Sequence, residues 1–182
     1  MKQQIRLIFG LALARSGDGG ASFAPKTILD SLVCDCCQPA PLLAGDEPLV
    51  AFRNVVKQGE DDLRDIYVVR LEGDKAAGEP VQVSDASWQI NACPISGPAV
   101  ALRGDELYVA WMDGRADSEH TGKRSDIWLA RSVDGGRSFG ANLRVNAPEG
   151  QHTLPALAAS SDGRAYLAWT DKQGAHVVAL GE

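Results

Sequence analysis

Residues 132–139 read SVDGGRSF, which predicts a tight turn between two β-strands. An aspartate side chain accepts hydrogen bonds from backbone N–H groups across such a turn, and glycine adopts the positive φ angles that the turn needs. Residues 16–23 read SGDGGASF and repeat the spacing of hydroxyl, carboxylate, glycine and aromatic side chains. The chain is therefore predicted to contain two equivalent β-hairpins, and we expect both phenylalanines to return to the apolar interior.

The same three residues, Ala-Arg-Ser, lead into both turns, and a repeat of this length is hard to obtain by accident. The shared positions are Ser16, Asp18, Gly20 and Phe23 in the first copy, and Ser132, Asp134, Gly136 and Phe139 in the second. This pattern resembles the Asp-box, or bacterial neuraminidase repeat, of the sialidase-like β-propellers. The resemblance implies that these eight residues are structural.

A second repeat has a longer period. Residues 38–54 and 97–113 superimpose at an offset of 59 positions, and a third copy begins at Leu154. Each unit holds four short runs rich in Val, Leu, Ile and aromatic residues, separated by turn-forming residues and without a helical period. Several runs are continuously apolar, which is typical of sheets buried on both faces. Each unit is predicted to be a four-stranded antiparallel blade.

These repeats predict an all-β chain in which residues 1–182 form one partial β-propeller domain of about three and a half blades. The predicted blades span approximately residues 5–30, 38–83, 97–145 and 154–180. Sialidase-like propellers usually have six blades, so the resemblance implies the C-terminal portion of a longer, exported protein. The alternative is a complete small β-sandwich, which does not explain the half-blade at the start.

Composition excludes some functions. The 182 residues carry a formal net charge of -6 and 45% hydrophobic residues, with no basic stripe, so a nucleic-acid surface is not expected. No run reaches the 18 apolar residues of a membrane span. Residues 1–14 resemble a short signal peptide, but cleavage after Ala14 would remove the strand that the first hairpin needs, so we favour a strand there.

The predicted blades sort the loops onto two ends, and the longer loops share the end opposite the Asp-boxes. Loops on a rigid scaffold are where function concentrates. The ligand-binding candidates in these loops are Arg53, Asp62, Trp88, Asp113, Arg115 and His120. The arginines are either carboxylate clamps or members of solvated ion pairs, and Trp88 is either a sugar-stacking platform or a plug over a blade interface.

The resemblance implies an arginine cluster, a tyrosine nucleophile activated by glutamate and an aspartic acid as proton donor. All three tyrosines lie inside predicted strands, so no catalytic residue is assigned. The first hypothesis is a propeller that binds a glycan or another small polar ligand on its loop face, with exo-alpha-sialidase-type hydrolysis in the complete protein. The alternative hypothesis is a non-catalytic propeller scaffold for protein–protein interaction.

The four cysteines are Cys34, Cys36, Cys37 and Cys93. Cys34 and Cys93 are equivalent under the 59-residue offset, so both are expected near the propeller axis on the loop face. Two disulfides suit an exported protein, and the favoured pattern joins Cys93 to one member of the cluster. A thiolate metal site, joined by His152, and free buried thiols are the alternatives. No other cofactor is expected.

Overall fold

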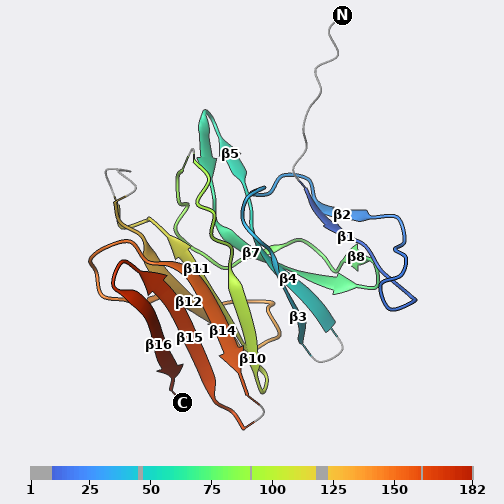
Figure 1. The fold of residues 1–182 in the computed structure, drawn as a ribbon. Coiled ribbons are helices and arrows are strands. Elements are labelled where there is room, and N and C mark those ends of the chain that lie inside the picture. The colour runs from blue at the N-terminus through green and yellow to red at the C-terminus, as the bar shows by residue number, and fades with distance from the viewer. Residues whose placement is uncertain (1–9, 45–46, 91, 118–122, 161, 182) are drawn as a thin grey trace, which may run out of the picture.

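The structure, a computed structural model, describes residues 10–44, 47–90, 92–117, 123–160 and 162–181. These residues form strands and connecting turns, and the prediction of an all-β fold is confirmed (Figure 1). None of the described segments is a helix long and apolar enough to cross a bilayer.

The strands form four antiparallel sheets and one small hairpin. The first sheet pairs β1 (Leu11–Leu13) with β2 (Thr27–Asp30). The second holds β3 (Ala40–Ala44), β4 (Glu47–Arg53) and β7 (Ile66–Glu72), with β8 (Lys75–Ala76) and β9 (Val81–Gln82) both paired to β7. The third holds β10 (Ala99–Arg103), β11 (Glu106–Asp113), β12 (Asp126–Ser132) and β13 (Leu143–Arg144). The fourth holds β14 (Thr153–Ala159), β15 (Ala165–Asp171) and β16 (Gly174–Leu180).

The strand register reproduces the 59-residue repeat. Leu42 lies opposite Leu49 in the second sheet, and Ala101 lies opposite Tyr108 in the third, each pair shifted by the same offset. The first and last sheets lie at opposite ends of the array, with the second and third between them (Figure 1). The repeated sequence therefore folds as repeated sheets in the same orientation.

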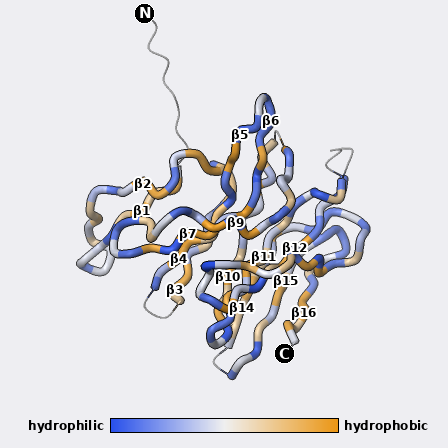
Figure 2. The backbone as a smooth tube through the Cα atoms, turned by 180° about the vertical axis from the view of Figure 1, so that it is seen from behind, coloured by the Kyte–Doolittle hydropathy of each residue, from blue (hydrophilic) through white to orange (hydrophobic). Residues whose placement is uncertain are grey.

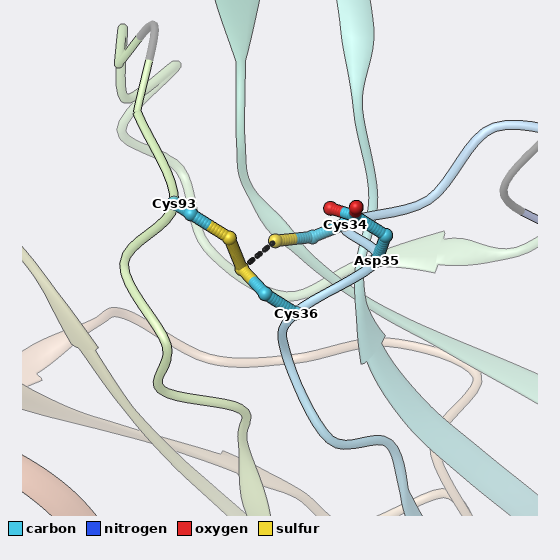
Figure 3. A group of neighbouring side chains, drawn as sticks. All are labelled: Cys34, Asp35, Cys36 and Cys93. Atoms are coloured by element: carbon cyan, nitrogen blue, oxygen red, sulfur yellow. Dashed lines mark hydrogen bonds between the residues drawn. A yellow bond between two sulfur atoms is a disulfide. The ribbon is translucent and has the colours of Figure 1, made fainter.

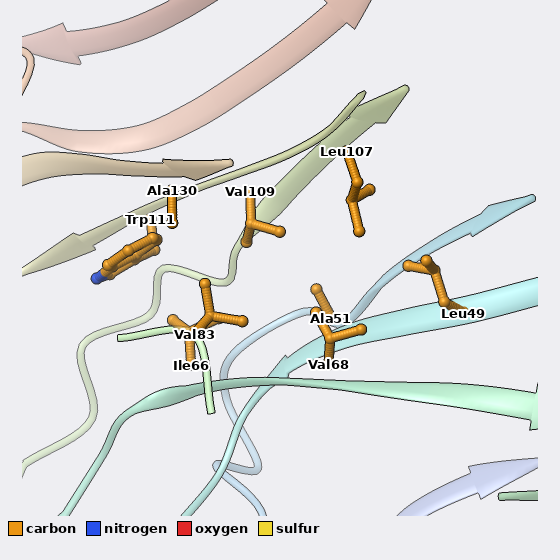
Figure 4. Close-up of a cluster of buried hydrophobic side chains, with 9 residues drawn as sticks. All are labelled: Leu49, Ala51, Ile66, Val68, Val83, Leu107, Val109, Trp111 and Ala130. Atoms are coloured by element: carbon orange, nitrogen blue, oxygen red, sulfur yellow. The ribbon is translucent and has the colours of Figure 1, made fainter. Parts of the chain in front are cut away.

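The core consists of separate apolar layers between neighbouring sheets. Along β11, alternate side chains face opposite ways, as a strand requires. Leu107, Val109 and Trp111 pack against the second sheet (Figure 4), and Tyr108, Ala110 and Met112 pack toward the fourth. Hydrophobic residues follow β4 and β7 in the same way, with hydrophilic turns at the periphery (Figure 2). Each fully buried Leu or Val contributes about 1.5–3 kcal/mol, so face-to-face packing of sheets stabilises the fold.

β4 is packed on both faces as well. Its residues Leu49 and Ala51 belong to the layer shared with the third sheet, whereas Val50 and Phe52 contact Leu11 of the first sheet. This two-sided burial accounts for the continuous apolar runs in the sequence. It is the packing of successive propeller blades.

The two predicted turns contain the same hydrogen-bond network. Ser132 Oγ donates to Asp134 Oδ1 at 2.7 Å and accepts from Gly136 N at 2.8 Å, while the Asp134 carboxylate accepts from Ser138 N at 2.9 Å. In the first copy Gly20 N donates to Ser16 Oγ at 2.7 Å, and Ser22 N donates to the Asp18 carboxylate at 2.9 Å. The last glycine of each turn has a positive φ, 82° at Gly136 and 95° at Gly20.

The two phenylalanines differ in burial. Phe139 is half-buried and packs against the layer between the second and third sheets. Phe23 is 65% exposed, so the expectation that it returns to the interior is wrong. Among the described residues no strand precedes β1, and the face that Phe23 would cover has no sheet against it. The same turn chemistry thus operates in a buried and in an exposed setting.

One element was not expected. The loop at residues 53–64 contains a hairpin of β5 (Val56–Gln58) and β6 (Asp61–Leu63), which projects from the second sheet (Figure 1). Its strands have three residues each, too few for a period-2 pattern to be recognised in the sequence.

The paired turns predict an asymmetric mutational effect. Ser132→Ala removes the acceptor for the buried Gly136 N–H, and we expect the free energy of unfolding to fall by about 1–3 kcal/mol. Ser16→Ala removes the same bond in an exposed turn, where water replaces it, and we expect a change within about 0.5 kcal/mol. Denaturant unfolding of both variants checks this, and equal losses would contradict it.

The turns also predict a pH dependence. Hydrogen bonds from the Ser138 hydroxyl and N–H, with that from Ser132, hold the pKa of Asp134 well below its ordinary value. A carboxyl whose pKa is lower in the folded state stabilises the protein above its unfolded pKa, and this stabilisation is lost as pH falls. Asp134→Asn should therefore be less stable than the parent at pH 7, with a difference that shrinks below about pH 4. Thermal melts across this range would show a constant difference if the interaction were absent.

Candidate functional site

A groove of about 420 Å³ lies where the first strands of three sheets meet. β10 lies beside β3 on one side and β14 on the other. The groove is lined by the starts of these strands and the residues before them, namely residues 38–41, 96–100 and 154–157. Because these strands begin at the end that carries the longer loops, the groove opens on the loop face.

The groove walls lie close together, and their backbone has restricted conformational freedom. Pro39, Pro41, Pro98 and Pro155 line it, and proline fixes φ. The backbone of Gly97 packs directly against that of Gln38, so a Cβ added to Gly97 would lie 1.9 Å from the carbonyl oxygen of Gln38. Only glycine permits this approach of two backbones.

Two strained residues flank the groove. Leu154 lines it with φ 54° and is 58% exposed, and Ile95, next to the lining residue Ser96, has φ 51° and is 71% exposed. A non-glycine residue with positive φ costs on the order of 1–3 kcal/mol and is concentrated at ligand sites. Apolar side chains are thus held exposed beside the groove at an energetic cost.

Ser96 supplies an unused polar group. It lines the groove and is 1% exposed, yet its Oγ has no hydrogen-bond partner among the described residues. Buried hydroxyls are normally paired, and an unpaired one calls for an explanation such as a ligand or an ordered water. Gln38, whose backbone adjoins Gly97, also lines the groove; it is exposed and offers an amide.

Arg53 lies beneath the groove and not on its surface. Its side chain is 1% exposed, and its guanidinium donates to the carbonyl oxygens of Arg64 at 2.8 Å, Ser96 at 3.1 Å and Met112 at 2.6 Å. Burial lowers its pKa. These donors are occupied by the backbone, so Arg53 supports the groove wall in place of clamping a carboxylate.

Trp88 is predicted to be either a sugar-stacking platform or a plug over a blade interface, and its position is that of a plug. It is 7% exposed, belongs to the layer between the third and fourth sheets, and lies 5.2 Å from the Arg53 guanidinium. Its backbone N–H donates to Asp65, whose pKa is raised by burial. A stacking platform would need an exposed ring face.

Asp113 and Arg115 pair with each other. Asp113 is 1% exposed and accepts from Trp111 Nε1 at 2.8 Å and from Arg115 Nη2 at 2.7 Å. Arg115 also binds Asp85 at 2.6 Å and lies 4.1 Å over the ring of Trp128. The structure brings this pair together as a structural cluster at the rim of the second and third sheets.

The other candidates lie apart. Asp62 lies in the middle of β6, where it pairs with Lys57 across the hairpin and with Arg64 at 3.4 Å. His120 lies outside the described residues. His152 is not near the cysteines but beside Asp171, with Nδ1 at 3.5 Å from Oδ2, and His176 Nε2 lies 2.9 Å from the same oxygen. His176 carries no local signal in the sequence, because only the β15–β16 register brings it to this loop.

Cys34, Cys36 and Cys93 converge at one place (Figure 3), and Cys37 lies beside Cys34. Cys36 and Cys93 form a disulfide, which confirms that Cys93 is joined to the cluster. Cys34 and Cys37 are buried free thiols, so the expectation of two disulfides is wrong for the second pair. Ligand atoms of Cys34, Asp35, Cys36 and Cys93 lie within 4.8 Å of one another. With Cys36 and Cys93 oxidised, this group lacks the thiolates that a metal site of this kind requires.

A tyrosine–glutamate pair lies at the opposite end, beside a larger hollow of about 700 Å³. Tyr108 donates to Glu106 at 2.6 Å, and Arg103 and Arg131 pair with the same carboxylate. Burial, followed by the hydrogen bond to Glu106, raises the pKa of Tyr108, which opposes a phenolate nucleophile. The polar groups here are already paired, in contrast to Ser96, so the groove is the stronger site.

The repeated sheets, packed face to face around the groove, define a β-propeller fold. No protein-family model matches the sequence, and no curated protein is similar to it in sequence. Similar solved structures exist. A xylan beta-1,4-xylosidase from Bacillus halodurans C-125 matches 93% of this chain over 35% of its own, with 13% identity and a TM-score of 0.53.

Two further structures are comparable. A protein of unknown function from Dyadobacter fermentans DSM 18053 matches 79% of this chain and 50% of its own, with 19% identity and a TM-score of 0.53. The GH43_1 enzyme from Xanthomonas citri, complexed with xylotriose, matches 77% of this chain and 41% of its own, with 20% identity and a TM-score of 0.51. This chain spans half or less of each structure's length, and at these identities the likeness establishes the fold alone.

The close approach at Gly97 predicts a sensitive position. Gly97→Ala drives a methyl group into the Gln38 carbonyl, and we expect the free energy of unfolding to fall by about 3 kcal/mol, the upper end of overpacking effects. Gly17→Ala is the matched control, because nothing lies within 4 Å of its added Cβ, and it should change stability by less than about 0.5 kcal/mol. Similar losses in the two variants, measured by thermal unfolding, would contradict the packing described here.

Proposed function

We propose that this chain is part of a sialidase-like, glycosidase-type propeller that binds a glycan or another small polar ligand in the loop-face groove. The observation that carries the proposal is the buried Ser96 hydroxyl, unpaired among the described residues, in a groove with stiff walls. This Oγ is itself buried, so we infer that the bound sugar displaces part of the lining; a sugar hydroxyl, which both donates and accepts, then pairs with it. The Gln38 amide, which also lines the groove, supplies a second polar contact that orients the ligand.

The fold supports a sugar ligand. The similar structures include a xylan beta-1,4-xylosidase and an enzyme complexed with xylotriose. Those ligands belong to those proteins, and sialic acid as the sugar of this one rests on the two Asp-box-like turns. The exposed Ile95 and Leu154 offer apolar contact to the faces of a sugar ring.

Binding is better supported than hydrolysis. Glycosidases generally need a pair of carboxyl groups flanking the scissile bond. The described groove lining contains neither aspartate nor glutamate, and the nearby Asp65 and Asp113 are buried and hydrogen-bonded. Exo-alpha-sialidase-type hydrolysis is therefore proposed for the complete protein, with carboxylates from outside this groove. Export to an oxidising compartment is also proposed, since the Cys36–Cys93 disulfide is stable there.

Calorimetric titration with xylotriose and with a sialylated trisaccharide tests the site. Ser96→Ala should weaken binding of the preferred sugar about tenfold, the effect of losing one buried hydrogen bond. Gln38→Ala should weaken it by a similar factor with an unchanged melting temperature, because the side chain is exposed. Gln173→Ala, an exposed glutamine on the same loop face outside the groove, is the control. Binding of neither sugar, or equal affinity in all variants, would refute the proposed site.

A further inference from the structure

Cys34 and Cys37 form a second, unoxidised pair next to the disulfide. They stand in Cys-x-x-Cys spacing, and their sulfur atoms lie 2.7 Å apart, close to the roughly 2.05 Å of a disulfide bond. Cys36 is bonded to Cys93, and its sulfur lies 3.6 Å from Cys34 Sγ (Figure 3). The four cysteines therefore divide into one closed bridge and one dithiol.

The surroundings favour a thiolate at Cys34. Arg64 Nη1 donates to Cys34 Sγ at 3.2 Å, and the pKa of Cys34 is lowered by the hydrogen bond with Cys37 and by the charge of Arg64. The pKa of Cys37 is raised by its hydrogen bond to Cys34 and by burial. An attacking thiolate paired with a protonated partner is the arrangement of a reactive Cys-x-x-Cys motif.

The dithiol lies beside open space. Both thiols line a hollow of about 380 Å³, with Leu11, Val33, Phe52 and Arg53 among its other walls. This hollow is distinct from the groove, which is lined by other residues except Pro39. Cys34 and Cys37 are only 3% and 6% exposed, so this hollow is the route by which a small molecule would reach them.

We propose that Cys34 and Cys37 are a redox-active dithiol site that exchanges with small disulfides of the glutathione class. The inference rests on the spacing, the sulfur contact, the adjacent guanidinium and the hollow. It is independent of the proposed glycan site.

The exchange proceeds through two successive attacks by thiolates on disulfide sulfurs. The Cys34 thiolate attacks one sulfur of R–S–S–R, so that a bond to Cys34 forms and R–S⁻ leaves and takes up a proton. Cys37 then loses its proton and attacks Cys34 Sγ, which releases the second R–S⁻ to be protonated in turn. Two electrons pass from the dithiol to the small disulfide, and the products are the Cys34–Cys37 disulfide and two R–SH molecules.

Oxidised glutathione added to the full chain tests this site. We expect two alkylatable thiols before treatment and none after it, with peptide mapping that finds Cys34 linked to Cys37 and Cys36 still linked to Cys93. Cys37→Ser removes the resolving thiol, so it should accumulate one glutathione adduct on Cys34. Cys34→Ser should react at least about tenfold more slowly, because the remaining thiol is protonated and buried.

A substitution at Arg64 tests its role in positioning the Cys34 thiolate. Arg64→Met should slow adduct formation at Cys34 several-fold in the Cys37→Ser background, whereas Arg70→Met, at an arginine of β7 that pairs with Glu47, should not. Circular dichroism spectra that match the parent show that the variants are folded. The proposal fails if the folded protein keeps both thiols, if the adduct forms on Cys37, or if Cys34 links to Cys36 or Cys93. Stoichiometric zinc released only when the thiols are titrated would overturn it in favour of a metal site.

Discussion

The buried guanidinium of Arg53 connects the parts of this protein that matter most for function. It donates to backbone carbonyls of the loop before the β7 strand, the groove wall and the end of β11, so one side chain fixes three segments relative to one another. Removing a charge from water is expensive unless its donors are all engaged. Arg53 also faces Cys34 and Cys37, where its charge favours thiolates. The groove and the dithiol thus share one electrostatic support.

Much of the architecture could be predicted from the sequence because turn chemistry and strand periodicity are local. The aspartate and glycines form the same turn around Asp134 and around Asp18, and an offset of 59 residues reappears as an identical strand register. The placement of Cys93 beside the cluster followed from the same offset. Each of these inferences needs only neighbours in the chain or a repeated spacing.

The site was harder to predict because it depends on how side chains point across sheets. Arg53 and Trp88 read as loop-face residues, yet the packing turns both inward. Ser96 carried no signal, since nothing in the sequence shows that a hydroxyl will be buried without a partner. The Cys34–Cys37 pair was overlooked within a denser run of cysteines, although its spacing is visible. Phe23 shows the reverse case, in which the expected turn forms but the phenylalanine stays exposed, with no sheet before the first one among the described residues.

The Cys36–Cys93 bridge has a topological consequence. Its two ends lie 57 residues apart, before the first strand of the second sheet and before that of the third, so the covalent loop encloses the entire second sheet. Closing a loop of this length removes conformational freedom from the unfolded chain and is worth about 4 kcal/mol in the chain-entropy model. The unfolded protein is therefore a ring with two tails. Reduction of this one bond opens that ring and widens the unfolded ensemble, so it lowers stability through the unfolded chain.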